Sequence, residues 1–253
     1  MHLTRLLTTL ITVDNMRDKY YVEQFGKSKI SLYLDSILYS GKSKFQDILI
    51  AHSPSVGTFL SLDGKLQSSE VDYFVYHESL VHPAVVSLDH PKNALVLGGG
   101  EGTAAKELLK YGNIGVDWVD IDNKVVSVCK KYLPYSLKKP EKRMKVTIGD
   151  AYEFVFSTKK RYDIVIDDVT GPDVKNKLSN KLYTRKFAKR IFNILTDQGV
   201  FITTTTEHAK NMWISTYKPE RLKDFPIIRP FQFYMPSFFD SFPAIFASKK
   251  MTH

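Results

Sequence analysis

The chain has 253 residues, of which 43% are hydrophobic and 25% are charged. This size and composition predict a globular protein with one substantial core, as one large domain or one main domain with a small addition. No apolar run approaches the roughly 20 residues that a transmembrane helix needs, so we expect no membrane association. The single cysteine, Cys129, excludes a disulfide within the chain.

The formal net charge is +9, which is compatible with nucleic-acid binding. The lysines are spread along the chain in short clusters, as at 138–139 and 159–161, without a nucleic-acid-binding motif. We therefore expect solvated basic faces and no nucleic-acid partner. His77 and His82 stand five residues apart without a further ligand cluster, so no metal site is predicted. Residues 1–13 lack a cleavage site for a signal peptide; we expect a cytoplasmic protein, with organelle targeting as the weaker alternative.

The first part of the chain has the pattern of β structure. Short apolar runs at 30–34, 48–51 and 58–62 are separated by turn signals, and Asp63-Gly64 is a typical hairpin turn. We expect a tail over residues 1–16, a small β domain over 17–73 and an α/β domain over 74–253.

From residue 74 the pattern changes to alternating helices and strands. Helices are expected at 76–86, 103–111, 124–132 and 184–195, and strands at 94–97, 115–120, 145–148, 164–168 and 199–204. Alternation of this kind, with bare apolar strands, predicts a parallel, Rossmann-like sheet that is covered on both faces. The stretch 227–248 is rich in aromatic residues and proline, and we expect antiparallel strands at one edge.

A glycine-rich loop follows the first strand of this domain. In open α/β sheets ligands bind beyond the carboxyl ends of the strands, and Gly98–Gly102 occupies that position with Glu101 inside it. Glycines allow a tight turn and a close approach to a ligand, and the next helix offers free N–H groups. A carboxylate at position 101 would repel a pyrophosphate, which disfavours a dinucleotide.

Acidic residues end the next three strands as well. They stand in the segments Asp120-Ile121-Asp122, Gly149-Asp150-Ala151 and Asp167-Asp168. Asp120 has roughly the 20-residue spacing of a ribose-binding acid, and Asp150 could accept the exocyclic amine of adenine. The pattern predicts a pocket for a nucleoside that carries positive charge, such as a sulfonium, together with a cationic co-substrate.

These residues resemble the polyamine aminopropyltransferases, the family of spermidine, spermine and thermospermine synthases. The resemblance covers about residues 44–249 and is carried by nine segments: Phe45–Ile48, Leu62–Gln67, Asp72–Glu78, Gly98–Gly102, Val119–Asp122, Gly149-Asp150, Tyr162–Asp168, Leu182–Thr184 and Tyr234–Phe238. It implies an S-adenosylmethionine-dependent transferase sheet that follows a small N-terminal β domain. It also implies transfer of the aminopropyl group of decarboxylated S-adenosylmethionine to an amine in polyamine biosynthesis, with release of methylthioadenosine.

The resemblance also implies roles for individual residues. The catalytic residues would be Asp168 and Tyr76. The nucleoside would be bound by Gln46, Gly98, Gly100, Glu101, Asp120, Ile121, Asp150 and Ala151, and the amine by Gln67, His77, Asp168 and Tyr234. Glu101 would hold the terminal amine of the aminopropyl chain and disfavour the extra carboxylate of intact S-adenosylmethionine. No metal is implied, and we expect a homodimer or homotetramer formed through the β domain.

Three positions depart from the family pattern. Gly171 stands where a second aspartate is usual, Tyr73 replaces an acid after Asp72, and Phe242-Pro243 replaces a Trp-Gly pair. The first two changes remove carboxylates from the side of the amine acceptor. Putrescine is the first expectation for the acceptor, whereas agmatine and spermidine stay open. A methyltransferase that uses intact S-adenosylmethionine, and a pseudoenzyme that stabilises an active partner, are the alternative functions.

Overall fold

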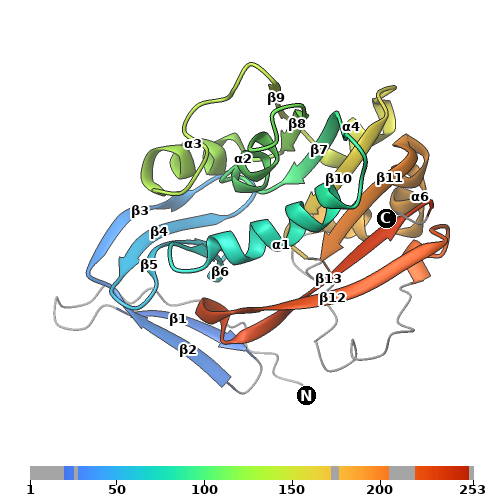
Figure 1. Cartoon of the computed structure of the whole chain (residues 1–253). Coiled ribbons are helices and arrows are strands. Elements are labelled where there is room, and N and C mark those ends of the chain that lie inside the picture. The colour runs from blue at the N-terminus through green and yellow to red at the C-terminus, as the bar shows by residue number, and fades with distance from the viewer. Residues whose placement is uncertain (1–19, 26–27, 172–176, 205–219, 251–253) are drawn as a thin grey trace.

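The computed structural model describes residues 20–25, 28–171, 177–204 and 220–250, so the predicted tail over 1–16 lies outside the described residues. Within this part, small antiparallel sheets at the N-terminal end lie beside a larger α/β domain (Figure 1). None of the helices in these ranges is long and apolar enough to cross a membrane. The predicted fold class, a Rossmann-like sheet preceded by a small β domain, is confirmed.

Two antiparallel sheets form the N-terminal part. A hairpin of β1 (Tyr20–Phe25) and β2 (Ser28–Tyr33) stands beside a four-stranded sheet of β3 (Ser36–Lys42), β4 (Asp47–Ser53), β5 (Gly57–Leu62) and β6 (Lys65–Ser69). Asp63 and Gly64 join β5 to β6 with φ angles of 49° and 73°. Positive φ at both central residues is the requirement of the tight hairpin turn predicted here.

The larger domain has a seven-stranded sheet in the order β12-β13-β11-β10-β7-β8-β9. Its strands are β7 (Asn93–Gly98), β8 (Gly115–Asp120), β9 (Met144–Ile148), β10 (Tyr162–Asp168), β11 (Leu195–Thr204), β12 (Ile227–Met235) and β13 (Asp240–Ser248). The pairs β10·β11, β10·β7, β7·β8 and β8·β9 are parallel. The last two strands pair antiparallel at one edge, as the aromatic stretch 227–248 predicts.

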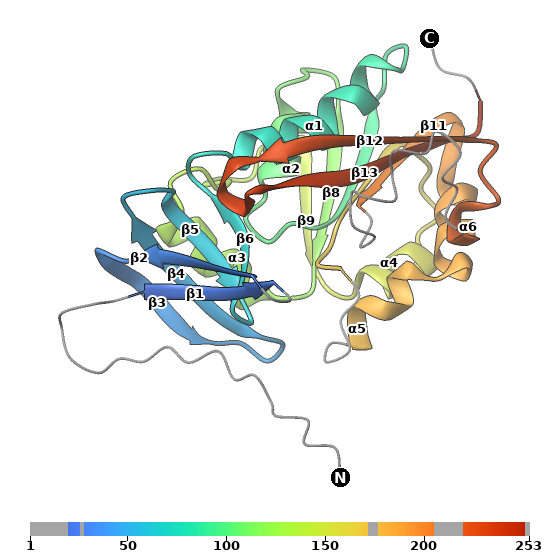
Figure 2. The same cartoon turned by 90° about the horizontal axis from the view of Figure 1, so that it is seen from below.

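Helices cover both faces of this sheet, as Figure 2 shows. The helices are α1 (Tyr73–Val86), α2 (Thr103–Leu109), α3 (Asn123–Tyr132), α4 (Ala151–Ser157), α5 (Lys177–Asn180) and α6 (Arg185–Ile194), with short 3₁₀ turns η1 (Lys181–Tyr183), η3 (Glu220–Leu222) and η4 (Pro236–Phe238). Side chains of β7 alternate between two cores: Leu95 and Leu97 pack with α4 and α6, whereas Ala94 and Val96 pack with α1 and α2. Burial on both sides explains why these strands are almost purely apolar.

The two parts of the molecule meet at α3. Val125 and Val128 on this helix form one buried cluster with Ile48, Ile50 and Leu60 of the four-stranded sheet. The β12–β13 hairpin makes a second connection, because Ser237 donates from its backbone N–H to the buried carboxylate of Asp72 at 2.7 Å. The β sheets are therefore held against the carboxyl ends of the parallel strands.

Candidate active site

A cavity of about 370 Å³ lies where the β sheets face the carboxyl ends of the parallel strands. Its walls come from both parts of the chain: from loops after the parallel strands, from β1, β5 and β6, and from the β3–β4 loop. Most of the residues that the sequence singles out line it: Gln46, Gln67, Tyr76, His77, Gly98, Gly100, Glu101, Asp120, Ile121, Asp150, Ala151 and Asp168.

The glycine-rich loop lies directly against Asp168. Gly98 and Gly99 have φ angles of 79° and 64°, which only glycine adopts readily. The N–H of Gly99 donates to the carbonyl oxygen of Asp168 at 2.8 Å. A Cβ atom at position 99 would lie 2.3 Å from Asp168 Oδ2. Glycine is therefore required here both by backbone conformation and by the nearness of the carboxylate.

Several carboxylates are buried at or beside this cavity, among them Glu101, Asp120, Asp167 and Asp168. Removal from water raises the pKa of Glu101 and of Asp120 to about 7, and that of Asp167 and of Asp168 to about 6. Burial disfavours the charged form of an acid unless a cation or hydrogen-bond donors compensate. Glu101 Oε1, Asp167 Oδ1 and Asp168 Oδ2 have no hydrogen-bond partner within the described residues. The site is thus built to receive positive charge.

His77 adds a third acceptor beside two of these oxygens. Its Nδ1 lies 2.6 Å from the carbonyl oxygen of Tyr73, and because a carbonyl only accepts, Nδ1 carries the hydrogen. Burial lowers the pKa of His77, so the ring is neutral and Nε2 presents a lone pair. Nε2 lies 3.4 Å from Glu101 Oε1 and 3.8 Å from Asp168 Oδ2. His77 Nε2 thus forms one cluster of acceptors with the two carboxylate oxygens, and such a cluster suits the N–H donors of an alkylammonium ion.

Tyr76 stands on the other side of Asp168. A hydrogen bond from the Tyr76 hydroxyl offsets part of the burial that raises the pKa of Asp168. Burial and the nearby carboxylate raise the pKa of Tyr76 well above its ordinary value, so its hydroxyl keeps its proton. Tyr76 is therefore a donor that orients Asp168.

Asp120 and Asp150 occupy the predicted positions at strand ends, but their hydrogen bonds differ. Asp120 Oδ1 accepts from the N–H of Asp122 at 2.7 Å. Asp150 Oδ1 accepts from the N–H of Tyr152 at 2.8 Å, and its Oδ2 pairs with Lys181. Both oxygens of Asp150 therefore have partners already, and an adenine amine would have to share one of them.

The structure does not bring Tyr234 to the cavity. This residue is 57% exposed on β12, whereas Phe231 and Phe233 pack towards α1. Successive side chains of a strand point to opposite faces, so position 234 faces away. Tyr234 was predicted because it belongs to the segment of resemblance Tyr234–Phe238. In the structure, Phe238 of this segment lines the cavity and Tyr234 does not.

Several residues of the cavity wall were not predicted as site residues, among them Glu23 and Phe238. Glu23 on β1 reaches the cavity although it precedes the segment of resemblance; its Oε2 accepts from the N–H of Leu66 at 2.7 Å and from the Tyr21 hydroxyl at 2.9 Å. Phe238 lines the cavity beside Phe242. The sequence around Glu23, Tyr-Tyr-Val-Glu-Gln, has no alternation of apolar and polar residues that would mark this position, so only the tertiary structure places it at the cavity.

The departures from the family pattern have different positions. Gly171 and Phe242 line the cavity, so the missing aspartate and tryptophan affect its wall. Tyr73 instead stacks on Tyr135, with ring centroids 4.3 Å apart. At position 73 an aromatic contact therefore replaces the acid, in the cluster where α3 packs against the four-stranded sheet.

A second polar group lies on the outer side of α1 and α2. The ligand atoms of Glu78, His82 and Glu107 all lie within 4.8 Å of one another, although spacing along the chain did not predict this group. Lys110 forms ion pairs with both carboxylates, and the Tyr111 hydroxyl contacts His82 Nδ1 at 2.8 Å. Glu78 and His82 lie on α1, whereas Glu107 lies on α2, so only the packing of the two helices brings the three side chains together. Lys110 offsets the negative charge of the two glutamates.

The fold and the cavity together define an α/β protein with an acidic cavity at the carboxyl ends of its parallel strands. Residues 73–253 match the family model of the spermine/spermidine synthase domain, and residues 20–70 match that of the spermidine synthase tetramerisation domain. The polyamine aminopropyltransferase of Clostridium perfringens is 35% identical over 227 residues, which cover 87% of this chain and 78% of that protein. Thermospermine synthase ACAULIS5 of Arabidopsis thaliana is 32% identical over 243 residues, which cover 92% and 71%.

Solved structures agree with these matches. A spermidine synthase in complex with the transition-state analogue AdoDATO has a TM-score of 0.83 and 28% identity, covering 94% of this chain and 83% of that chain. Spermidine synthase from Thermotoga maritima has a TM-score of 0.80 and 27% identity, covering 94% and 81%. The chain belongs to the polyamine aminopropyltransferase family, and the predicted family and enzyme class are confirmed.

Proposed function

We propose that this enzyme transfers the aminopropyl group of decarboxylated S-adenosylmethionine to a linear amine, with putrescine as the first acceptor. The observation that carries the proposal is the convergence of Glu101 Oε1, Asp168 Oδ2 and His77 Nε2. Two of these atoms are buried without a hydrogen-bond partner among the described residues. The primary ammonium of an aminopropyl chain would supply one N–H to each acceptor. Intact S-adenosylmethionine would add a carboxylate at the same place, where Glu101 repels it.

The remaining predicted residues support binding of the nucleoside. Asp120 stands at the end of β8 with one oxygen directed by the N–H of Asp122, which suits a ribose hydroxyl. Asp150 and Ala151 begin α4 on the same wall, where the adenine edge would lie. Gln46 closes the wall from the β domain.

Asp168 is our candidate for the acid–base residue. A protonated alkylamine has a pKa of roughly 10 and no free lone pair, so its proton must leave before or during attack. The amine nitrogen forms a bond to the methylene carbon beside sulfur, the carbon–sulfur bond breaks, and its electron pair turns the sulfonium into a neutral thioether. The Asp168 carboxylate accepts the proton from nitrogen, and Tyr76 holds that carboxylate in place.

We assign Glu23 and Gly171 to the part of the cavity wall that faces the amine acceptor. Glu23 supplies a carboxylate from β1, while Gly171 supplies none after β10. A diamine needs one anionic group at its distal end, and Glu23 can provide that group. A single carboxylate on this side favours putrescine as the acceptor. Because Gly171 has no side chain, agmatine and spermidine should be compared with putrescine directly.

An acceptor panel tests the proposal. Purified enzyme is incubated with decarboxylated S-adenosylmethionine and putrescine, agmatine or spermidine, and products are identified by mass. We expect methylthioadenosine together with spermidine as the main amine product. Asp168→Asn should lower kcat by about 10²–10⁴-fold, the usual contribution of a general base, and leave the Kd of methylthioadenosine unchanged, since that product has no amine. Transfer from intact S-adenosylmethionine only, or no turnover by the chain alone, would contradict the proposal.

A further inference from the structure

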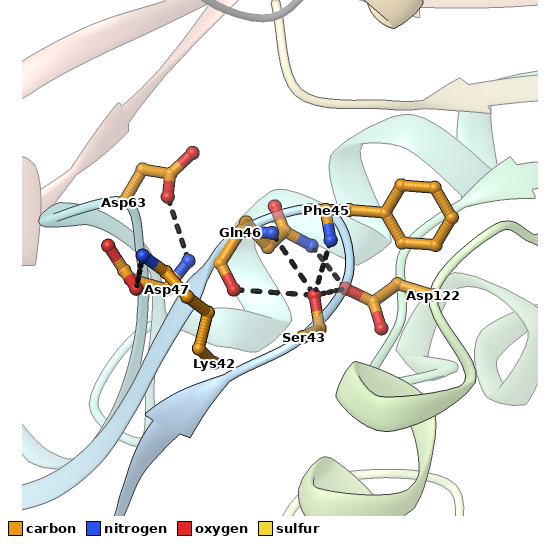
Figure 3. A network of polar contacts seen from close by, with 7 residues as sticks. All are labelled: Lys42, Ser43, Phe45, Gln46, Asp47, Asp63 and Asp122. Carbon is orange, nitrogen blue, oxygen red and sulfur yellow. Dashed lines mark hydrogen bonds and ion pairs between the residues drawn. The ribbon is translucent and has the colours of Figure 1, made fainter.

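A single carboxylate ties the β3–β4 loop to the first turn of α3. Asp122 Oδ2 accepts from Ser43 Oγ at 2.6 Å and from Gln46 Nε2 at 3.1 Å (Figure 3). Its other oxygen, Oδ1, accepts from the N–H groups of Lys124 and Val125 at 3.0 and 3.2 Å, which caps the helix. Asp122 is only 2% exposed, so four hydrogen bonds within the chain use most of its acceptor capacity.

Ser43 is the donor in its hydrogen bond with Asp122. Its Oγ accepts from the N–H groups of Phe45 and Gln46 at 3.0 and 3.1 Å. A hydroxyl has one hydrogen and two lone pairs, so both lone pairs are used inside the loop. The hydrogen goes to Asp122 Oδ2 at 2.6 Å, which is nearer than the carbonyl oxygen of Gln46 at 3.3 Å. The loop is therefore held in one conformation against the α/β domain.

The same contact decides which atom Gln46 offers to a ligand. A carboxylate oxygen can only accept, so the NH₂ group of Gln46 must face Asp122. Gln46 lines the cavity, whereas Asp122 is not among the residues that line it. The amide oxygen of Gln46 is consequently the atom left for the ligand, and it suits an O–H or N–H donor of a nucleoside.

We propose that Asp122 is a positioning residue for nucleoside binding, which sets the orientation of the Gln46 amide and closes the β3–β4 loop over the site. This role rests on the proposed nucleoside function of the cavity. Asp122 links the two parts of the chain at this site. It accepts from Gln46 of the β domain, and its own N–H donates to Asp120 Oδ1 at 2.7 Å.

The Asp122→Asn substitution tests the role because asparagine caps helices as well as aspartate does. Its amide NH₂ replaces the acceptor that Gln46 needs, so the Gln46 amide must turn over and present NH₂ to the ligand. Loss of a hydrogen bond of this kind lowers affinity by about tenfold. We expect the Kd of methylthioadenosine, measured by calorimetry, and the KM of decarboxylated S-adenosylmethionine to rise by about that factor, with the KM of the amine acceptor unchanged.

A second substitution separates positioning from a merely structural effect. In the double variant Asp122→Asn with Gln46→Glu, the new carboxylate accepts from the asparagine NH₂ and returns an oxygen acceptor to the cavity. The Ser43 hydroxyl, which loses its acceptor on residue 122, turns to the backbone carbonyl oxygen of residue 46, 3.3 Å away. We expect affinity for methylthioadenosine to recover to within about threefold of wild type. Gln46→Glu alone should weaken binding, because it would place two carboxylates against each other.

Asp63→Asn is the matched control. Asp63 Oδ1 accepts from the N–H of Asp47 at 2.8 Å in the same region of the β domain (Figure 3), and asparagine tolerates its φ of 49°. This variant should bind methylthioadenosine as wild type does. If wild type binds and Asp122→Asn binds equally well, or the double variant is not rescued, the role of Asp122 is wrong. If wild type does not bind methylthioadenosine at all, the proposed function is wrong and the role of Asp122 falls with it.

Discussion

Buried carboxylates are the residues that give this site its chemistry, and they oppose folding when no ligand is present. Glu101 is 6% exposed and takes a pKa of about 7 through loss of hydration, with the neighbouring carboxylate of Asp168 adding to the effect. An ammonium ion between these groups would restore the interactions that burial removes. The same residues therefore reduce stability in the empty enzyme and, in the proposed function, would bind the substrate cation.

Replacement of Glu101 by glutamine should raise stability at alkaline pH. Because the pKa of Glu101 in the folded state lies above that of an ordinary glutamate, the folded protein holds a proton that the unfolded chain has lost, and stability falls as pH rises from about 4 to 7. Glu101→Gln removes this cost, on the order of 1–3 kcal/mol. The melting temperature at pH 8 should exceed that of wild type by several degrees, and the difference should disappear near pH 4.5.

The companion measurement is binding of decarboxylated S-adenosylmethionine, which Glu101→Gln should weaken strongly. A variant that is less stable than wild type at pH 8, or that binds the nucleoside equally well, would contradict the assignment of Glu101. Asp168→Asn provides a comparison, since it removes a carboxylate from the same group of acceptors but leaves Glu101 in place.

Among the elements, the β7–α2 loop is the most constrained by geometry. Gly98 is held by the indole N–H of Trp118, which donates to its carbonyl oxygen at 2.7 Å. Gly99 is held by the backbone of Asp168 on β10. The loop therefore holds the ends of β7, β8 and β10 in fixed positions relative to one another, and a change in it displaces the carboxylate of Asp168.

Gly99→Ala adds only one methyl group, but we expect it to reduce activity strongly. The added Cβ would lie 2.3 Å from Asp168 Oδ2 at a φ of 64°, so both the carboxylate and the backbone must move. We expect a loss of stability of about 1–3 kcal/mol, as for other residues forced into a positive φ, and a fall in kcat of at least tenfold. Thermal unfolding and steady-state kinetics measure the two effects.

Gly112→Ala is the control for this substitution. No atom lies within 4 Å of a Cβ at position 112, and its φ does not lie in the left-handed region. Its activity and melting temperature should match those of wild type. Equal behaviour of the two alanine variants would show that the loop is not held as the structure describes.

At the scale of the whole molecule, the β1–β2 hairpin exposes an apolar face. Tyr20 and Val22 alternate with buried residues on β1, and Tyr33 pairs with Tyr20 across the hairpin. Residues 20–70 match the family model of a tetramerisation domain. We propose that this face joins copies of the chain into a homodimer or homotetramer, in which the exposed rings would be buried.

A charge on this face should dissociate the oligomer. The double variant Val22→Glu with Tyr33→Glu should have the mass of a monomer in light scattering, whereas wild type should have two or four times that mass, because carboxylates resist burial in an apolar contact. Val86→Glu changes a residue that is 74% exposed at the end of α1 and should leave the mass unchanged. A monomeric wild type, or an unchanged mass in the double variant, would contradict the proposed interface.

Much of the fold was predictable from local patterns. The apolar runs at 94–97 and 164–166 have no polar face to place in water, which favours central strands with helices on both sides. Asp63-Gly64 could only be a tight turn, because both residues adopt positive φ. The ends of elements were less predictable: β11 begins at Leu195, where a strand was expected only from 199, since pairing with β10 extends it.

The amino-acid sequence by itself determined the order of the strands and helices and the acids that end the parallel strands. Only the tertiary structure decided which acids lose water and partners, because burial depends on segments that are distant along the chain. Glu23 enters the cavity from β1, Tyr234 turns away from it, and Asp122 faces Gln46 across the domain seam. The chemistry of each side chain is local, whereas its pKa and its orientation are set by what folding places around it.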